Sequence, residues 1–391
     1  MPRGAEGFAE RTEKAHEKIG EIDEQKKQNR SDHELNVDQL SVPVNGRRGE
    51  DMIWIDEQGG RRPRKGEELP MKLETLYRKA VEIGIENDLR GKDEIRRILD
   101  EEKEKSRKLS TEEFEFYDRD RLFNPFSDTR ILCGDPQTEV RRAMVGIDME
   151  APEILLAYLL NRDRGENIDL IIAHHPEGHA LARLYDVMRL QADLLAGYGV
   201  ATSVAELLLE KRIGEVERRL LPVNHQRAVD AARTLGMPMM CVHTPADNCV
   251  TGYLKNLFED RKPHRLKDLI DLLKDIPEYR KSSRLSVPPK IVNGSEEGKC
   301  GKIFVDMTGG TEGSKEIFEK QAAAGISTIV GMHFSEEALD NAKKANLYAV
   351  IAGHVSSDAL GLNLLFDRLE AEGPVDFIGV SGFERIRRTA G

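Results

Sequence analysis

The chain has 391 residues, of which 39% are hydrophobic and 33% charged, and its formal net charge is -11. This length allows two ordinary domains with a real core, and the negative charge argues against broad contact with a nucleic-acid backbone. The four cysteines form no CxxC pair, which fits a reducing compartment, and no segment approaches the roughly 20 apolar residues of a membrane-spanning helix. We therefore expect a cytoplasmic protein that has neither a membrane nor a nucleic acid as partner.

Residues 1–70 form a polar segment with charged runs such as "EKIGEIDEQKKQNRSDHE". So few apolar side chains do not offset the entropy lost when a chain is ordered. The segment therefore predicts a mobile arm or an extension that a partner orders. The apolar run Ile53–Ile55 is the exception, and it predicts a short strand or a docking point.

From Lys72 onward the apolar residues recur at helical spacing, with a break near Gly91. The segment "VRRAMVGIDM" then predicts a strand, "APEILLAYLLNR" a helix, and "IDLIIA" a short buried strand. Helical patterns in "LARLYDVMRLQADLLAGYGV" and "HQRAVDAARTLG" lead to a further buried strand in "MPMMCVH". This alternation predicts a largely parallel sheet.

The same alternation restarts after a helix and a proline-marked link in "KPHRLKDLIDLLKDIPEYRKSSRLSVPP". Strands are predicted in "KIFVDMTGG", "ISTIVGMH" and "LYAVIAGH", with helices between them. The predicted fold class is therefore α/β, with two similar α/β units, mostly parallel sheets and a polar N-terminal extension. The predicted segments are a charged extension over 1–70, a first unit over 71–260, a helical linker over 261–300 and a second unit over 301–391.

Three of the predicted strands end in side chains that can bind metals. They are followed by His174 and His175, by His243 and Asp247, and by His354 and Asp358. A single HxxxD pair more often caps a helix or makes a surface contact. Three such groups at the carboxyl ends of strands, where α/β proteins bind their ligands, instead favour a metal site built from imidazole and carboxylate.

The motifs "DLIIAHHP", "VHTPAD", "GGTEGS" and "LYAVIAGHVSSD" follow "SDTRILCGDPQTEVRRAMVGIDM" in this order. In this combination the chain resembles the Nif-three-like dinuclear metal-centre family, whose bacterial members are often labelled GTP cyclohydrolase 1 type 2 homologues. The resemblance implies two divalent metal ions (zinc, iron or manganese) held between the two α/β units by His174, His175, Asp247, His354 and Asp358. It also implies a homo-oligomer, often a hexameric ring in this family.

The chain departs from the family pattern at two positions. Asp358 stands where the family usually has glutamate, so whether this shorter side chain bridges both metals depends on how closely the backbone approaches them. Glu336 stands where family members commonly have histidine. His333, three residues earlier, is either a substitute for that histidine or an exposed residue at a strand end.

Four further residues near the motifs have a candidate role. His179 and Glu177 are candidate catalytic residues that could move protons, although a helix-surface histidine and a charge at a helix N-terminus fit them equally well. Asp148 could accept a hydrogen bond from a ligand histidine or cap the next helix. We expect His243 to support the turn that presents the carboxylate four residues later.

Two adjacent divalent cations can turn a shared water into a nucleophile and also hold a substrate oxygen. The expected function is therefore a dinuclear metal-dependent hydrolase-like protein in which metal-bound hydroxide attacks a nucleotide-like or phosphoester substrate. The alternative is a non-enzymatic metal-binding, metal-delivery or regulatory scaffold protein, because the same ligands bind metal without catalysis. A third interpretation is a DNA-associated regulator that uses the basic patches before Pro70.

Overall fold

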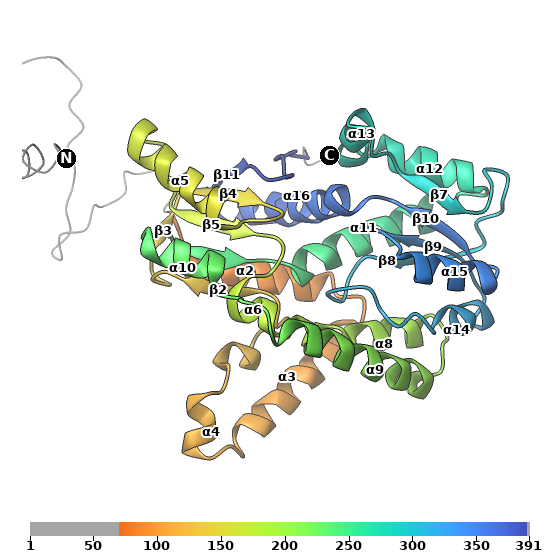
Figure 1. The fold of residues 1–391 in the computed structure, drawn as a ribbon, viewed down its shortest axis with the longest axis horizontal. Coiled ribbons are helices and arrows are strands. Elements are labelled where there is room, and N and C mark those ends of the chain that lie inside the picture. Colours follow the sequence, from red (N-terminus) through yellow and green to blue (C-terminus); the bar gives the residue numbers. More distant parts are fainter. Residues whose placement is uncertain (1–69, 389–391) are drawn as a thin grey trace, which may run out of the picture. The chain divides into compact units, whose positions relative to one another are not determined.

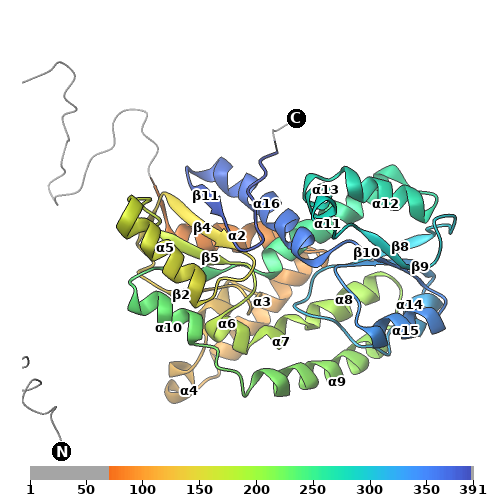
Figure 2. The same cartoon turned by 45° about the horizontal axis from the view of Figure 1, so that its top comes forward.

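The computed structural model describes residues 70–388, and Figures 1 and 2 show how their helices and strands are arranged. The extension predicted over 1–70, with its strand at Ile53–Ile55, lies outside the described residues apart from Pro70. No helix in the described part is long and apolar enough to cross a membrane.

The helices are α2 (Leu73–Glu86), α3 (Lys92–Ser106), α4 (Thr111–Glu115), η1 (Arg119–Leu122, a short 3-10 helix), α5 (Ala151–Arg164), α6 (Gly178–Ala182), α7 (Leu184–Val187), α8 (Arg189–Gly197), α9 (Thr202–Leu220), α10 (Arg227–Thr234), α11 (Thr244–Arg261), α12 (Leu266–Asp275), α13 (Pro277–Arg284), α14 (Phe318–Ala323), α15 (Glu336–Lys344) and α16 (His354–Glu372). The strands are β1 (Met71–Lys72), β2 (Arg130–Cys133), β3 (Glu139–Val140), β4 (Arg142–Gly146), β5 (Leu170–Ala173), β6 (Met239–Cys241), β7 (Lys290–Asn293), β8 (Lys302–Asp306), β9 (Ile326–Gly331), β10 (Tyr348–Ile351) and β11 (Asp376–Gly379).

Within residues 70–388 the strands form two mostly parallel sheets and a small antiparallel pair, β1 with β3. The five-stranded sheet has the order β11-β4-β5-β6-β2, and only its edge strand β2 runs antiparallel to its neighbour. The four-stranded sheet has the order β7-β10-β9-β8, and only its edge strand β7 is antiparallel. The predicted α/β class with two mostly parallel sheets is confirmed.

The sheets take strands from more than one of the predicted segments. Strand β11 lies in the segment 301–391 but pairs with β4 of the five-stranded sheet. Strand β7 lies in the segment 261–300 and pairs with β10 of the four-stranded sheet. The two prolines directly before β7 suggested a link, yet proline is tolerated at the entrance to an edge strand. The segment boundaries themselves stay a prediction.

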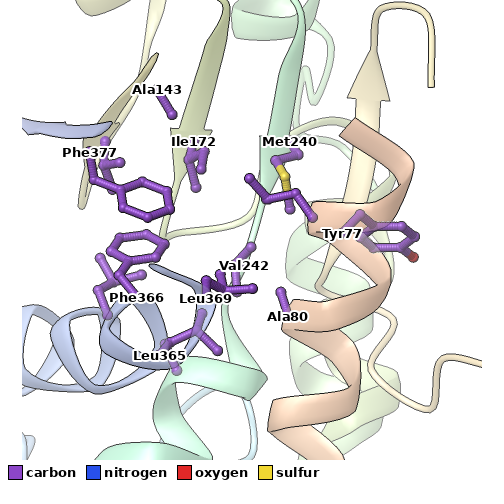
Figure 3. Packing of buried hydrophobic residues seen from close by; sticks show 14 of the residues in the cluster. Tyr77, Ala80, Ala143, Ile172, Met240, Val242, Leu365, Phe366, Leu369 and Phe377 are labelled. Carbon is purple, nitrogen blue, oxygen red and sulfur yellow. The ribbon is translucent and has the colours of Figure 1, made fainter. Parts of the chain in front are cut away.

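Helices cover both faces of the five-stranded sheet, which explains why its central strands are apolar without alternation. Ile171 packs with residues of α5 and α10 on one face. Its neighbour Ile172 packs on the other face with residues of α2 and α16 (Figure 3). On this second face Phe366 of α16 stacks on Phe377 of β11, with ring centroids 4.1 Å apart, so the last strand is fixed to the sheet by the same core.

The four-stranded sheet is also covered on both faces. Residues of α8, α9, α14 and α15 form a hydrophobic cluster with Phe304 and Ile329 on one face. Residues of α11, α12 and α13 pack with Val305 and Val330 on the other. Helix α11 therefore packs on the four-stranded sheet, although it follows β6 of the five-stranded one.

Helices α11 and α16 pack against each other where the two sheets meet, as both views show (Figures 1 and 2). Gly361 of α16 allows this contact, because a Cβ atom there would lie only 2.4 Å from the carbonyl oxygen of Ala246. Gly84 of α2 similarly leaves room for Pro245, whose Cβ atom would be 2.7 Å from an added Cβ. The first turns of α11 and α16 are thus held close together by backbone packing.

Candidate metal centre

The predicted ligands come together between the two sheets. His174 and His175 directly follow β5, and Asp247 lies in the first turn of α11, just after β6. His354 and Asp358 lie on the first two turns of α16, after β10 of the other sheet. The close packing of α11 on α16 therefore joins side chains that are far apart in the sequence.

The donor atoms form two groups that share Asp358. One group is His174, Asp247 and Asp358, the other is His175, His354 and Asp358, and within each group the ligand atoms lie within 4.8 Å of one another. One oxygen of Asp358, Oδ1, is 3.5 Å from His174 Nε2. Its second oxygen, Oδ2, is 3.6 Å from the Nε2 atoms of both His175 and His354. These buried groups could hold a metal ion. Asp358, which is shorter than the glutamate usual in the family, faces both groups.

Four buried polar atoms at this point have no hydrogen-bond partner among residues 70–388. They are His174 Nε2, Asp247 Oδ1 and both carboxylate oxygens of Asp358. His174 Nδ1 donates to the carbonyl oxygen of Val242 at 3.1 Å, so the lone pair of Nε2 can face the carboxylates. Because an unpaired buried carboxylate is costly, a bound cation would satisfy all four atoms. The residues present therefore fit a divalent metal.

The electrostatics of the site favour a neutral His175, a neutral His354 and at least one charged carboxylate. Burial, followed by the charge of His174, lowers the pKa of His175 to about 4, and burial also lowers the pKa of His354. Burial opposes ionisation of Asp358, but His174 and the histidines around it hold its pKa below the usual value. Neutral imidazoles and carboxylates are the protonation states that bind metals.

An outer carboxylate orients His175. Asp148 Oδ1 lies 2.7 Å from His175 Nδ1, so this nitrogen donates its proton and leaves Nε2 free toward the donor group. This contact is one of the two roles that the sequence left open for Asp148.

His243 is held by a second carboxylate that the sequence interpretation did not identify. His243 Nδ1 donates to Asp128 Oδ2 at 2.8 Å, and the Thr244 hydroxyl donates to the same oxygen at 2.6 Å. His243 Nε2 then lies 3.8 Å from Asp247 Oδ2. Burial opposes protonation of His243, but Asp247 and Asp128 outweigh it and raise its pKa to about 9. Its ring nitrogen also forms a possible donor group with His174 and His175.

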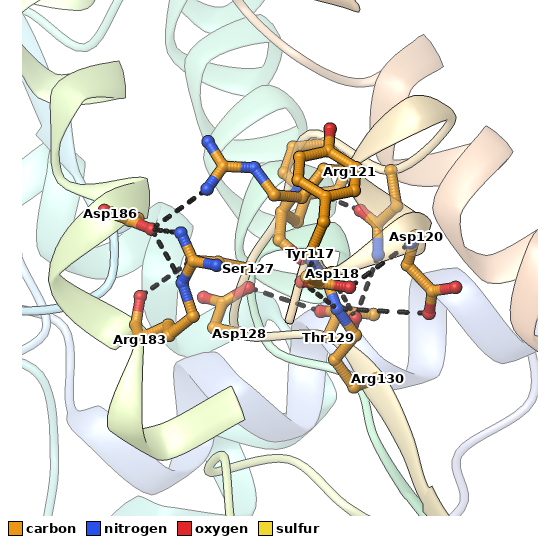
Figure 4. Close-up of polar contacts among 12 residues, drawn as sticks. Tyr117, Asp118, Asp120, Arg121, Ser127, Asp128, Thr129, Arg130, Arg183 and Asp186 are labelled. Carbon is orange, nitrogen blue, oxygen red and sulfur yellow. Dashed lines mark hydrogen bonds and ion pairs between the residues drawn. The ribbon is translucent and has the colours of Figure 1, made fainter. Parts of the chain in front are cut away.

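The segment that carries Asp128 is fixed by a buried polar network (Figure 4). Arg130, at the start of β2, is 1% exposed and pairs with Asp118 at 2.8 Å. Thr129 accepts a hydrogen bond from the His243 backbone N–H on its Oγ1 at 3.1 Å. Asp128 is thus placed rigidly, although it is far from His243 in the sequence.

A cavity of about 260 Å³ opens beside the donor groups. Its lining residues are His175, Pro176, Leu181, Leu184, His243, Asp247, Asp306, Met307, Thr308, Gly310, Thr311, Glu312, Met332, His333 and His354. His333 therefore faces the site, with its ring centroid 5.1 Å from that of His354. Glu336 does not line the cavity and begins α15 with an exposed side chain.

The two candidate catalytic residues do not line this cavity. Gly178 has a φ of +58°, and its N–H donates to the carbonyl oxygen of His225 at 2.9 Å, so the chain turns toward the segment before α10. Glu177 precedes α6, and burial followed by Glu150 raises its pKa to about 7. His179 is exposed on α6. Their catalytic roles stay predictions.

Comparison with known proteins gives matches among solved structures, whereas no protein-family model and no curated protein matches the chain. The chain is similar to a NIF3 superfamily protein from Sphaerobacter thermophilus, with 25% identity, 66% of this chain and 92% of that chain covered, and a TM-score of 0.56. It is more distantly similar to reduced HcgD from Methanocaldococcus jannaschii, with 14% identity, 64% and 87% covered, and a TM-score of 0.41. A Bacillus cereus protein related to NIF3 has 12% identity, 64% and 89% covered, and a TM-score of 0.33.

The fold and the donor groups together define an α/β protein whose buried histidines and aspartates fit a metal-binding protein. The likeness to the Sphaerobacter protein agrees with the order of the histidine and aspartate motifs. The chain has the fold of NIF3 superfamily proteins, and the resemblance found in the sequence is confirmed.

Proposed function

We propose that the protein holds two divalent metal ions and acts as a hydrolase on a nucleotide-like or phosphoester substrate. The observation that supports this proposal is Asp358, whose two unpartnered oxygens face two different groups of histidines. Two such ions, when bound, supply the activation of water, whose pKa they lower from 15.7 to about 7, and the polarisation of a substrate oxygen.

Each group of side chains would hold one ion. His174, Asp247 and one oxygen of Asp358 form the first ligand set, and His175, His354 and the other oxygen form the second. Imidazole and carboxylate ligands suit zinc, iron or manganese. The hydrogen bonds from the Nδ1 atoms of the two adjacent histidines fix their rings, which a metal site requires.

Proton transfer at this site needs a group that reaches the cavity. His333 lines the cavity and belongs to neither ligand set, and it is therefore the better-placed proton carrier. Glu177 and His179 could act only through intervening water or a movement of the chain. Replacing His333 with alanine should therefore lower turnover more than replacing either of them.

The alternative proposal is a non-enzymatic metal-binding, metal-delivery or regulatory scaffold protein. Metal binding without catalysis needs only the two ligand sets, so the same donor groups also support this alternative. The family resemblance further supports a cytoplasmic homo-oligomer, with a hexameric ring as the expected form. Analytical ultracentrifugation of the full chain would measure that oligomeric state.

Elemental analysis and turnover separate the two proposals. The hydrolase proposal predicts two ions per chain and turnover of nucleotides or phosphodiesters that Asp247→Ala abolishes. Glu336→Gln, an exposed acid outside the cavity, is the matched control and should retain both metal and turnover. Bound metal without turnover above the Asp247→Ala background would support the metal-binding alternative, and the absence of bound metal would contradict both.

A further inference from the structure

Helix α9 has one side that packs on the core and one side that faces solvent. The buried side joins the hydrophobic cluster on one face of the four-stranded sheet, through residues such as Leu209 and Ile213. On the opposite side Leu207 is 75% exposed, and Leu221, which directly follows the helix, is 71% exposed. In Figures 1 and 2 α9 lies on the outside of the described part. Single exposed leucines are common on protein surfaces, so their significance depends on what lies between them.

The residues on the solvent side of α9 are arranged symmetrically about Gly214. Leu207 and Leu221 lie seven residues before and after this glycine, and Glu210 and Arg218 lie four residues before and after it. Since an α-helix has 3.6 residues per turn, these offsets place all five residues on one face, which we call the α9 stripe. A second α9 laid antiparallel on the first, with the two glycines opposite each other, brings leucine against leucine and glutamate against arginine at both ends.

No packing contact within residues 70–388 explains Gly214. It lies in the middle of the 19-residue helix, where glycine is less favourable than alanine. An added Cβ atom would meet Nη1 of Arg218 at 3.1 Å, and this end of a flexible side chain can move aside. A residue without a side chain does, however, let a second helix approach closely at a crossing point. The symmetric contact therefore gives this glycine a role that the isolated chain does not.

The two halves of the α9 stripe are complementary in charge. Glu210 pairs with Arg189 at 3.1 Å, but both side chains are 63% exposed, so the carboxylate stays open to a second cation. Arg218 is exposed and forms no ion pair with another residue in the range 70–388. In the antiparallel arrangement Glu210 and Arg218 meet twice, because a two-fold contact repeats each pair. Such pairs fix the direction and register of the two helices.

The N-terminal half of α9 also borders a cavity of about 610 Å³, whose other wall is α3. Its apolar surface comes from Ile98, Leu99, Leu190, Leu207 and Ile213. Seven acidic and five basic residues line the cavity, so its charge is negative on balance. In the antiparallel arrangement its mouth meets the end of the second α9, where Arg218 stands close to the apolar Leu221. That end of the helix matches the cavity in both charge and polarity.

We propose that a second copy of this chain docks on the α9 stripe as an antiparallel pair of helices, with a two-fold axis between the two Gly214 residues and Leu221 of each copy at the cavity mouth of the other. The inference goes beyond the homo-oligomer of the proposed function, because it assigns the surface, and it uses no residue of the metal centre. A single pair of helices is at the low end of specific interfaces, so the association is reversible and weakens with added salt.

Gly214→Cys tests the two-fold axis in the full chain. In a Cys133→Ser background, which leaves only buried native thiols, oxidised glutathione should link two copies through this position, because a disulfide needs Cα atoms about 4.4–6.8 Å apart. Ser203→Cys, an exposed position of the same helix, is the matched control. Its two copies would lie about 33 Å apart in the proposed pair and should stay unlinked. No linkage through Gly214→Cys, or equal linkage through both variants, would overturn the proposal.

Charge reversal gives a second measurement, by analytical ultracentrifugation of the full chain. Arg218→Glu should weaken self-association about tenfold or more, since the two-fold axis counts the change twice. Adding Glu210→Arg should return the dissociation constant to within about threefold of wild type. These two residues lie about 12 Å apart along one helix, so the rescue requires a contact between copies. Arg219→Glu, exposed but off the stripe, is the matched control and should change the constant less than about threefold.

Every variant should keep the metal content of wild type, so failure of this contact and failure of the proposed hydrolase are separate results. A wild type that stays monomeric at about 100 µM would overturn the inference, even if the cavity then binds a basic amphipathic peptide. An Arg218→Glu variant that assembles like the wild type, or a double variant without rescue, would overturn it equally.

Discussion

Asp247 offers a test in which a single substitution should have opposite effects on the metal-free and the metal-bound protein. Its side chain is 4% exposed, and Oδ1 has no hydrogen-bond partner among residues 70–388. Burial raises the pKa of Asp247 from 3.8 to about 6, and the nearby His243 only partly offsets this effect. The ionised carboxylate is therefore unfavourable in the folded protein as long as no cation is bound. Asp247→Asn keeps the shape of the side chain and removes its charge.

The sign and size of the effect follow from the linkage between protonation and folding. Below pH 3.8 Asp247 is protonated in both the folded and the unfolded chain. As the pH rises toward 6, the unfolded chain ionises first, and the folded state loses stability, by about 3 kcal/mol in total. The asparagine variant avoids this loss. Metal-free Asp247→Asn should therefore be more stable than the metal-free wild type by up to about 3 kcal/mol at pH 7, and by about half as much at pH 5.

Metal reverses this order, because it binds the carboxylate of the wild type. A ligand at 1,000 times its Kd adds about 4.1 kcal/mol to the free energy of unfolding of the wild type, which exceeds the difference of about 3 kcal/mol between the metal-free proteins, and the variant should gain much less. Urea unfolding at pH 5 and pH 7, with and without added metal, measures all four values. Asp260→Asn, an exposed position on the same helix α11, is the matched control and should change none of them. A metal-free Asp247→Asn protein that is less stable than wild type at pH 7 would refute this reasoning.

Four further substitutions, one of them a control, test the surroundings of the site. Asp148→Asn removes the carboxylate that orients His175, and should lower metal affinity about 10- to 100-fold, measured by competition with a chelator; an unchanged affinity would show that His175 binds metal without this partner. Gly361→Ala places a Cβ atom 2.4 Å from a carbonyl oxygen of α11, and should cost about 1–3 kcal/mol in thermal unfolding together with loss of metal. Gly252→Ala, where the nearest atom is 3.9 Å away, should change the stability by no more than about 1 kcal/mol, and equal effects of the two glycine variants would contradict the packing argument. Asp358→Glu lengthens a side chain that is 1% exposed and already faces both donor groups, so elemental analysis should find less metal per chain, whereas wild-type content would show that the site has spare room.

The features that the sequence predicted best are those governed by short-range patterns. The apolar runs that became β5, β6 and β10 were evident because strands buried on both faces need no alternation. The ends of these strands then located His174, His175 and the acids of α11 and α16. The same rule applied to "KIFVDM" would also have placed Asp306 at the edge of the cavity, since this residue too ends a parallel strand.

The features that the sequence did not predict depend on contacts between distant segments. Asp128 precedes β2 without any local motif, and its role arises only because β2 pairs with β6 and brings it to His243. Conversely, Glu177 and His179 follow the histidine pair closely in the sequence, yet neither lines the cavity beside the donor groups. Closeness in the sequence is therefore a poor guide to the cavity beyond the strand end itself.

The reach of Asp358 shows how packing can replace side-chain length. The sequence left open whether an aspartate could face both metal sites in place of the family's usual glutamate. In the structure its two oxygens lie 3.5 and 3.6 Å from histidines of the two groups. Gly361, one turn further along the same helix, lets the backbone of α16 approach that of α11 more closely than any other residue would. The short side chain of Asp358 can therefore face both groups only because α16 lies so close to α11. A change in the length of this side chain should require a change in the helix contact, and the reverse.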